Sequence, residues 1–199
     1  MKILTPTRLP LFVFTAAYLA TAAFYFSSVG NTEFLGYIAA VTLILLMVAC
    51  TLHWTCIPSW LLWLLSLQML LHILGGGVII NGDVLYNYVV FPIDNPTGLT
   101  FLKFDQIVHT FGSAVASLIA FFFLRKGGFH PLGLFLLTVF AACGLGALNE
   151  VIEFIAKLSI PDTDVGGYYN TGVDLVVNLF GSVLGTSLAL KFWKAKKSA

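Results

Sequence analysis

Charged residues are scarce in this chain, and their scarcity excludes most soluble proteins. Only 10% of its 199 residues are Asp, Glu, Lys or Arg, whereas 59% are hydrophobic and the mean hydropathy is +0.95. A soluble domain carries about 25% charged residues. The formal net charge of +1 gives no reason to expect nucleic-acid binding. The composition therefore predicts an integral membrane protein whose solvent is mostly lipid.

Cysteine is also rare, and long polar stretches are missing. The three cysteines are Cys50, Cys56 and Cys143, an odd number that does not suit a disulfide framework. Once the apolar runs are assigned to the membrane, no polar segment long enough to form a soluble domain is left over. We therefore expect a single integral membrane domain over residues 1–199.

Six apolar runs are each close to the roughly 20 residues that a membrane-spanning helix needs. The first starts like a signal peptide, but it is long and further spans follow, so we interpret it as a helix that stays in the protein. The sequence thus predicts an all-α, polytopic bundle of about six transmembrane helices, at 9–26, 33–52, 58–77, 101–124, 131–156 and 170–190. The connection 78–100 is apolar and aromatic, and it predicts an interfacial or re-entrant segment able to cover a site.

Basic residues are distributed unequally between the two sides of such a bundle. Six spans put both termini on one side, which then holds eight of the ten basic residues, including Lys2, Arg8, Arg125 and the lysines of the C-terminal tail. Cytoplasmic loops of membrane proteins carry an excess of Lys and Arg. The pattern predicts that both termini lie in the cytoplasm, with the acidic residues toward the outer side.

Three of the spans each carry a pair of polar residues on one helix face, and at least one residue of each pair is ionisable. Asp105 and His109 are four residues apart, Glu150 and Glu153 are three apart, and Asp174 lies four residues before Asn178. A charge near the centre of a membrane helix costs about 2.5–3.5 kcal/mol on insertion scales, so such residues usually face a bundle interior. The three pairs predict a polar site between helices.

Depth and packing suggest that the pairs converge. A helical rise of about 1.5 Å per residue places them, together with His72 of the third span, roughly 5–12 Å from the outer helix ends. Gly181 and Gly185 continue the face of Asp174 and Asn178 inward. Because small residues let membrane helices approach closely, we expect an outward-facing cavity with a closed floor.

A set of residues in the C-terminal two thirds resembles a known family. The set comprises His72 with Gly75-Gly76, Tyr86, Pro92, Phe104-Asp105, His109, Glu150, Glu153, and Asp174 with Gly181 and Gly185. Their order and spacing over residues 70–187 resemble the YjdF-like family of bacterial inner-membrane proteins, and the last segment is similar to VanZ-like proteins. Phe104, Phe154 and Asn170 depart from the family pattern. The resemblance implies the inner-membrane location and the architecture, and leaves the activity open.

The first functional hypothesis is a metal-dependent hydrolase or transferase acting on a lipid or lipid-linked substrate at the outer leaflet. Imidazoles and carboxylates are ligands for Zn, Mn or Fe, so we predict a divalent metal held by His72, Asp105, His109 and Asp174. Glu150 and Glu153 are the predicted catalytic residues, because metal-assisted hydrolysis needs a carboxylate base. Tyr86 and Asn178 are predicted to contact the substrate.

Two alternatives remain open on the sequence alone. In a transporter or cation-coupled permease the carboxylates form a relay, but such a relay needs polar residues that continue to the cytoplasmic side, and the sequence indicates almost none. In a structural protein the cluster joins helices by hydrogen bonds. Membrane lipids are the expected partners in every case, and the sequence makes no prediction of oligomeric state.

Overall fold

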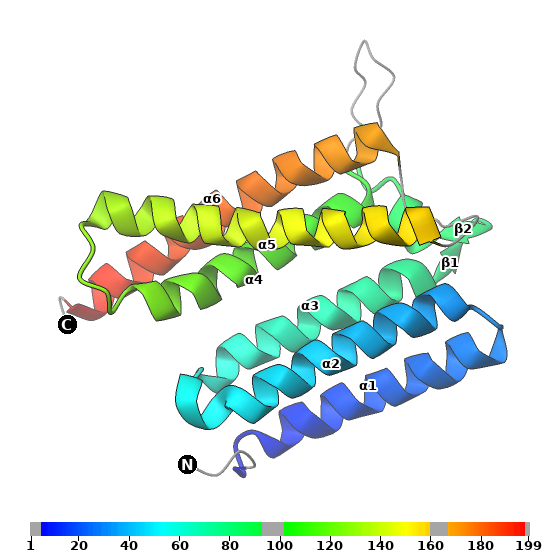
Figure 1. The fold of residues 1–199 in the computed structure, drawn as a ribbon, viewed down its shortest axis with the longest axis horizontal. Coiled ribbons are helices and arrows are strands. Elements are labelled where there is room, and N and C mark those ends of the chain that lie inside the picture. Colours follow the sequence, from blue (N-terminus) through cyan, green and yellow to red (C-terminus); the bar gives the residue numbers. More distant parts are fainter. Residues whose placement is uncertain (1–4, 93–101, 160–166, 198–199) are drawn as a thin grey trace. The chain divides into compact units, whose positions relative to one another are not determined.

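Six long helices dominate the computed structural model, which describes residues 5–92, 102–159 and 167–197 (Figure 1). All six are long and apolar enough to cross a membrane. They are α1 (Leu9–Ser28), α2 (Thr32–Thr55), α3 (Ser59–Gly77), α4 (Phe104–Leu124), α5 (Pro131–Ser159) and α6 (Tyr168–Lys197). The predicted all-α class is confirmed, and the protein is a multi-pass membrane protein.

The helix ends differ from the predicted spans by a few residues, for local reasons. Pro58 is the N-cap residue of α3, so the helix starts one residue later, at Ser59. Helix α4 starts at Phe104 rather than 101, because Leu102 has a φ of 56° that no right-handed helix accommodates. Helix α6 continues into the lysine-rich tail as far as Lys197. Hydropathy alone detects none of these features. The first two depend on backbone conformation, and the third lies in a polar tail.

The chain forms two compact units, Met1–Tyr86 and Asn87–Ala199. In the first, α1, α2 and α3 pack through aromatic rings, with Phe26 and Phe34 stacked at 4.8 Å between ring centroids. Gly76 lies directly against the Phe34 ring, where any side chain would collide with it. Asn31 caps α2 by accepting a hydrogen bond from the Phe34 amide. Small and aromatic residues thus lock the ends of the three helices together.

A short hairpin follows α3. Its strands are β1 (Ile79–Ile80) and β2 (Asp83–Val84), joined by Asn81 and Gly82 with φ values of 55° and 87°. An Asn-Gly pair with both φ positive is the preferred two-residue turn of hairpins. A 3₁₀ turn, Leu85–Asn87, comes next, and Val89 pairs with Lys103. The remainder of the predicted interfacial segment, residues 93–100, lies outside the described residues, so its role as a cover stays a prediction.

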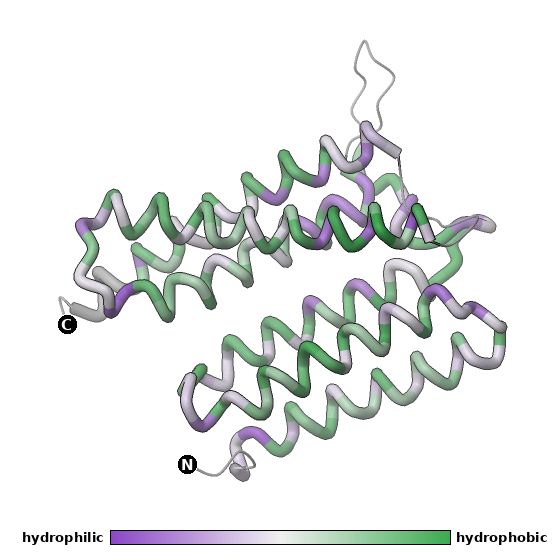
Figure 2. Tube along the Cα trace, in the orientation of Figure 1, coloured by the Kyte–Doolittle hydropathy of each residue, from purple (hydrophilic) through white to green (hydrophobic). Residues whose placement is uncertain are grey.

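The second unit consists of α4, α5 and α6 packed around small residues. The Gly181 position on α6 meets the backbone of Thr110 on α4, and the Gly185 position meets Ala114 and Ser117. The predicted close approach of these helices is confirmed. Figure 2 shows apolar residues along all three helices, with polar residues concentrated toward the start of α4 and of α6.

Candidate functional site

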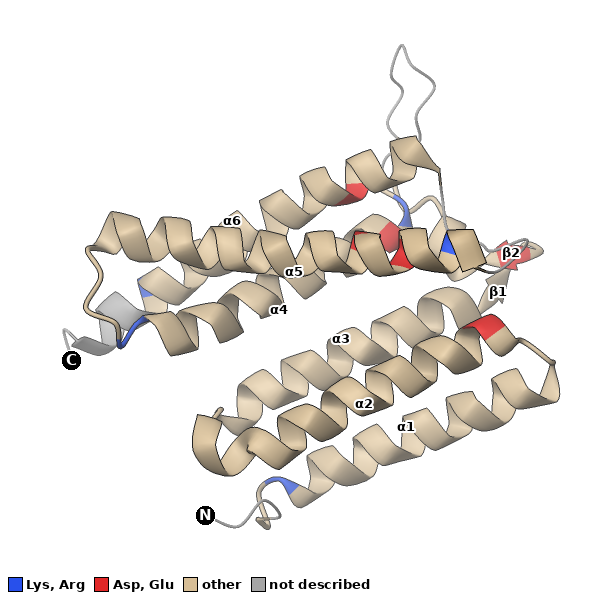
Figure 3. Ribbon diagram, viewed as in Figure 1, with Lys and Arg blue, Asp and Glu red and all other residues tan. Residues whose placement is uncertain are grey.

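The acidic residues that the structure describes in the second unit gather at one end of its helices. Figure 3 shows them on α4 and α6 near the start of each helix and on α5 near its end. Asp105 lies in the first turn of α4, Glu150 and Glu153 lie in the last ten residues of α5, and Asp174 lies in the second turn of α6. Because α5 runs antiparallel to α4 and α6, its end meets their beginnings, and the predicted convergence of these three helices is confirmed.

His109 is the centre of this cluster. Its Nε2 lies 3.5 Å from a carboxylate oxygen of Asp105 and 3.9 Å from one of Glu153. Its Nδ1 lies 3.4 Å from an oxygen of Glu150. One imidazole therefore connects carboxylates from two helices, and its two nitrogens face different partners.

Two asparagines orient the carboxylates, each from one turn earlier on the same helix. The Asn149 side-chain amide donates to Glu153 at 2.6 Å. The Asn170 amide donates to Asp174 at 2.6 Å and to Asp105 at 3.3 Å. The sequence analysis assigned neither residue to the site. The shared spacing, an asparagine four residues before an acid, is the signal that would have revealed both.

Burial is deepest at Glu150 and Asp174. Glu150 is 6% exposed and Asp174 is fully buried, while the Asp105 side chain is 16% exposed and that of Glu153 is 23% exposed. Among the described residues, neither carboxylate oxygen of Glu150 has a hydrogen-bond partner, and Oδ1 of Asp174 has none. Buried polar atoms are normally satisfied, so these oxygens indicate that a ligand belongs in the cluster.

Asn178 lies one turn deeper than Asp174. Its carbonyl accepts a hydrogen bond of 2.6 Å from the Ser113 hydroxyl, and its side chain packs against Gly146 of α5. It is 2% exposed, and its Nδ2 has no partner among the described residues. Asn178 thus joins all three helices directly beneath the acids, and its predicted contact with a substrate stays a prediction.

His72 and Tyr86 belong to the first unit and contact each other. The Tyr86 hydroxyl donates to the His72 backbone carbonyl at 2.8 Å and lies 2.8 Å from Nδ1 of the same residue. A hydroxyl has one proton, so His72 must be the donor in the second contact. Nδ1 therefore carries a proton, and in the neutral ring the lone pair resides on Nε2. This tautomer suits a metal ligand, and the predicted metal role of His72 and substrate role of Tyr86 stay predictions.

The donor atoms of the cluster fit a divalent cation. Two triads, Asp105–His109–Asp174 and His109–Glu150–Glu153, each offer one oxygen or nitrogen per residue, and within each triad these atoms lie within 4.8 Å of one another. Ligand atoms about 2.0–2.2 Å from one ion lie at most about 4.4 Å apart, so small side-chain movements suffice to close either triad. Oxygen and imidazole donors suit Zn, Mn or Fe.

Polar residues also continue beyond the cluster, which corrects the sequence analysis. Ser117 on α4 and Ser182 and Thr186 on α6 are fully buried. Hydropathy reveals little of them, because isolated hydroxyls barely lower the hydropathy of a helix. The same stretch contains Gly185, packed against Ala114 and Ser117, so α4 and α6 are in close contact there.

Comparison with known proteins gives one match. A family model described as "Predicted membrane protein (DUF2238)" matches residues 9–195. No curated protein and no solved structure matches the chain. The match supports the resemblance to YjdF-like proteins, a name for this same family, whereas the relation to VanZ-like proteins stays a prediction.

Proposed function

The chain belongs to the DUF2238 family of membrane proteins, and from this premise we propose that its buried histidine–carboxylate cluster is the divalent-metal centre of a hydrolase or transferase. The observation that carries the proposal is the buried acid Asp174, whose Oδ1 lacks a hydrogen-bond partner among the described residues and whose donor atoms lie close to those of Asp105 and His109. We further propose that the substrate is a lipid or a lipid-linked molecule.

Electrostatic repulsion within the cluster supports a cation. Two unit charges 4 Å apart repel by about 4 kcal/mol at an effective dielectric constant of 20. Four carboxylates gather here, and each triad places its donor atoms within 4.8 Å. The imidazole of His109 offers at most one compensating charge. A divalent cation offsets this repulsion and also satisfies Oδ1 of Asp174, which otherwise lacks a partner among the described residues.

The two ring nitrogens of His109 suggest which residues bind the metal and which residue orients the histidine. Nε2 faces Asp105, and these two residues form a triad with Asp174, which makes that set the proposed ligands. Nδ1 faces Glu150 at 3.4 Å. Metal-bound histidines usually donate their second ring N–H to a carboxylate or carbonyl, which fixes the ring orientation. Glu150 is therefore the proposed acceptor that orients His109.

Glu153 is the proposed general base. It is the most exposed of the four acids, and the Asn149 amide holds one of its oxygens. Such a carboxylate can take a proton from water next to the ligands without leaving its position. The metal, when bound, supplies an electrophile and an acidified water. Asn149 and Asn170 hold the acids in place, and Asn178 closes the cluster from below.

The position of the cluster supports a lipid substrate. Asp105 and His109 are the second and sixth residues of α4 and Asp174 is the seventh of α6, so they lie within roughly 2–9 Å of the helix starts. A reacting group at that depth lies near the boundary between hydrocarbon and headgroups. Lipid headgroups and their ester or phosphate linkages occupy this region. We propose that it faces outward, with both termini in the cytoplasm of the inner membrane, because the basic residues collect on the opposite side.

One observation favours a second candidate, a cation-coupled permease. The buried hydroxyls of Ser182 and Thr186, which have no partners among the described residues, extend from Asp174 toward the far side of the membrane. A permeation path also needs room, yet Gly181 and Gly185 hold α6 against the backbone of α4 over this stretch. The tight contact favours the enzyme over the permease.

The decisive experiment measures metal content by elemental analysis of detergent-purified protein. We expect about one Zn, Mn or Fe per chain in the wild type and less than a tenth of that in Asp105→Asn and Asp174→Asn. Asp83→Asn, in the exposed β2 strand, is the matched control and should retain the metal. Glu153→Gln should keep the metal but lose hydrolysis of lipid substrates. Wild-type protein that binds none of these metals after reconstitution would contradict the proposal and favour the structural alternative.

A further inference from the structure

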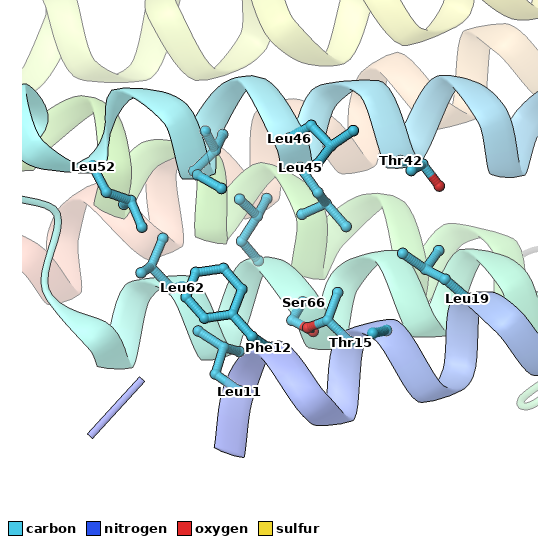
Figure 4. A pocket seen from close by; sticks show the side chains of 14 residues that line it. Leu11, Phe12, Thr15, Leu19, Thr42, Leu45, Leu46, Leu52, Leu62 and Ser66 are labelled. Atoms are coloured by element: carbon cyan, nitrogen blue, oxygen red, sulfur yellow. The ribbon is translucent and has the colours of Figure 1, made fainter. Parts of the chain in front are cut away.

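An apolar pocket lies within the first unit, between α1, α2 and α3. Its volume is about 340 Å³. Figure 4 shows side chains from the three helices around it, with Leu11 and Phe12 of α1, Leu45 of α2 and Leu62 of α3 among them. The pocket lies entirely in residues 11–66, and the proposed metal centre makes no use of it.

Two of the three hydroxyls in the pocket wall are already paired with each other. The Thr15 and Ser66 hydroxyls lie 2.7 Å apart in a hydrogen bond, and the Tyr18 hydroxyl donates to the Ser66 carbonyl. Polar atoms paired in this way do not select a polar guest. The remaining lining is almost wholly aliphatic, so the pocket suits a hydrocarbon chain.

The length of the pocket matches one lipid leaflet. Its wall extends from Leu11 to Leu19 on α1 and from Leu52 back to Thr42 on α2, which corresponds to about 12 and 15 Å of helix. Half of a hydrocarbon core of about 30 Å is about 15 Å. One acyl chain of the leaflet nearest the start of α1 therefore fits along the pocket.

The Arg8 side chain lies near the end of this pocket where α1 begins. Arg8 is the N-cap residue of α1, three and four residues before Leu11 and Phe12, so it continues the pocket-lining face. It is 7% exposed and donates one hydrogen bond, from Nη2 to the Ile57 carbonyl at 3.1 Å. Among the described residues, its Nη1 has no acceptor.

The described surroundings of Arg8 contain no negative charge to balance its guanidinium. A helix N-terminus carries a partial positive charge, so a cation is unfavourable there. The described acids of the first unit, Glu33 and Asp83, lie at the start of α2 and in the hairpin after α3, at the opposite ends of the helices. A small turn of the guanidinium would bring Nη1 to an acceptor that packs against this end of α1.

We propose that this pocket binds one anionic phospholipid, with an acyl chain along α1 and α2 and its phosphate accepting hydrogen bonds from Arg8. The acyl chain fills the apolar pocket, and the phosphate supplies the negative charge that the end of α1 lacks. The proposal concerns the first unit alone and is independent of the metal centre.

Native mass spectrometry of the full-length protein in detergent tests this proposal, with dioleoyl-phosphatidylglycerol as the probe and dioleoyl-phosphatidylcholine as the comparison. We expect one tightly retained phosphatidylglycerol per chain and at least tenfold weaker retention of phosphatidylcholine. Arg8→Gln should remove this preference. Ala49→Phe, which fills the pocket, should lower retention of both lipids at least tenfold. Ala40→Phe, on an exposed part of α2 outside the pocket, should behave like the wild type.

Several outcomes would overturn the proposal. Equal retention of both lipids by the wild type would show that Arg8 does not select a lipid of net negative charge, and oleate retained as tightly as phosphatidylglycerol would indicate a fatty-acid site. A dimer that Ala49→Phe converts to monomer, with lipid retention unchanged, would show that a second copy covers the pocket. Circular dichroism checks that the variants fold. Ala16→Phe fills the pocket from α1 if Ala49→Phe does not fold.

Discussion

At the scale of single residues, the candidate site depends on pairs four residues apart on one helix. Asp105 with His109, Asn149 with Glu153, and Asn170 with Asp174 each interact across one helical turn. His109 connects α4 to α5 through both of its ring nitrogens. The charges of the site can therefore be located from sequence, whereas the residues that orient them become clear only from the hydrogen bonds.

The two asparagines provide a prediction at this scale. We expect Asn170→Ala to weaken metal affinity by about 10–100-fold, because groups that orient metal ligands typically contribute that much. Asn149→Ala loosens only the proposed base, Glu153, and should leave metal affinity unchanged. Titration of the metal-free protein with zinc measures the effect. Asn81→Gly removes an exposed amide in the hairpin turn, where glycine readily adopts the φ of 55°, and should leave affinity unchanged. Unchanged affinity in Asn170→Ala, or an equal loss in Asn149→Ala, would contradict this assignment of roles.

The Tyr86 hydroxyl provides a second prediction for single residues. It makes two hydrogen bonds of 2.8 Å to His72, and the Tyr86 ring covers Gly75. Tyr86→Phe keeps the ring and removes both bonds, which should lower stability by about 1–3 kcal/mol because net hydrogen bonds contribute about 0.5–1.5 kcal/mol each. Denaturant unfolding in detergent measures the loss. Tyr88→Phe, at a 45% exposed position, should change stability by less than half as much.

At the scale of elements, each helix follows from an apolar run, and its ends follow from local backbone chemistry. Pro58 starts α3, Asn31 caps α2, and the positive φ of Leu102 delays α4. The packing of α4 on α6 depends on glycines whose absent side chains leave room for the backbone of the neighbouring helix. Hydrophobicity identifies the helices, and small residues select which faces meet.

The α4–α6 contact predicts opposite signs for two glycine substitutions. At Gly185 an alanine methyl would meet the Ala114 backbone and the Ser117 hydroxyl, so the helices must separate, and we expect a loss of about 1–3 kcal/mol. At Gly144 on α5 nothing lies within 4 Å. There the higher helix propensity of alanine should raise stability by up to about 1 kcal/mol. Thermal unfolding of Gly185→Ala and Gly144→Ala compares them, and a loss at both sites would contradict the packing.

At the scale of the whole molecule, six spans and an asymmetric distribution of basic residues govern the topology. An even number of spans puts both termini on one side of the membrane, and the clustering of Lys and Arg predicts that this side is the cytoplasm. The proposed orientation places the start of α4, and the site with it, on the outer side.

Reporter fusions test this topology. Green fluorescent protein joined after Ala199 should fluoresce, because it folds in the cytoplasm, and alkaline phosphatase at that position should be inactive. Alkaline phosphatase joined after Gly82, in the hairpin turn, should be active. The reverse pattern would place the termini outside and the candidate site on the cytoplasmic side.

The sequence by itself determined the membrane class, the six helices and the residues that carry charge inside them, because hydropathy and helical periodicity are local properties. Only the tertiary structure decided that Asp105, Glu150 and Asp174 meet around His109, since they come from three helices separated by up to 69 positions along the chain. It also showed the asparagines that hold the acids and the buried hydroxyls beneath them. Hydrogen-bond partners depend on which helix faces pack together, and packing is a property of the assembled bundle rather than of any one segment.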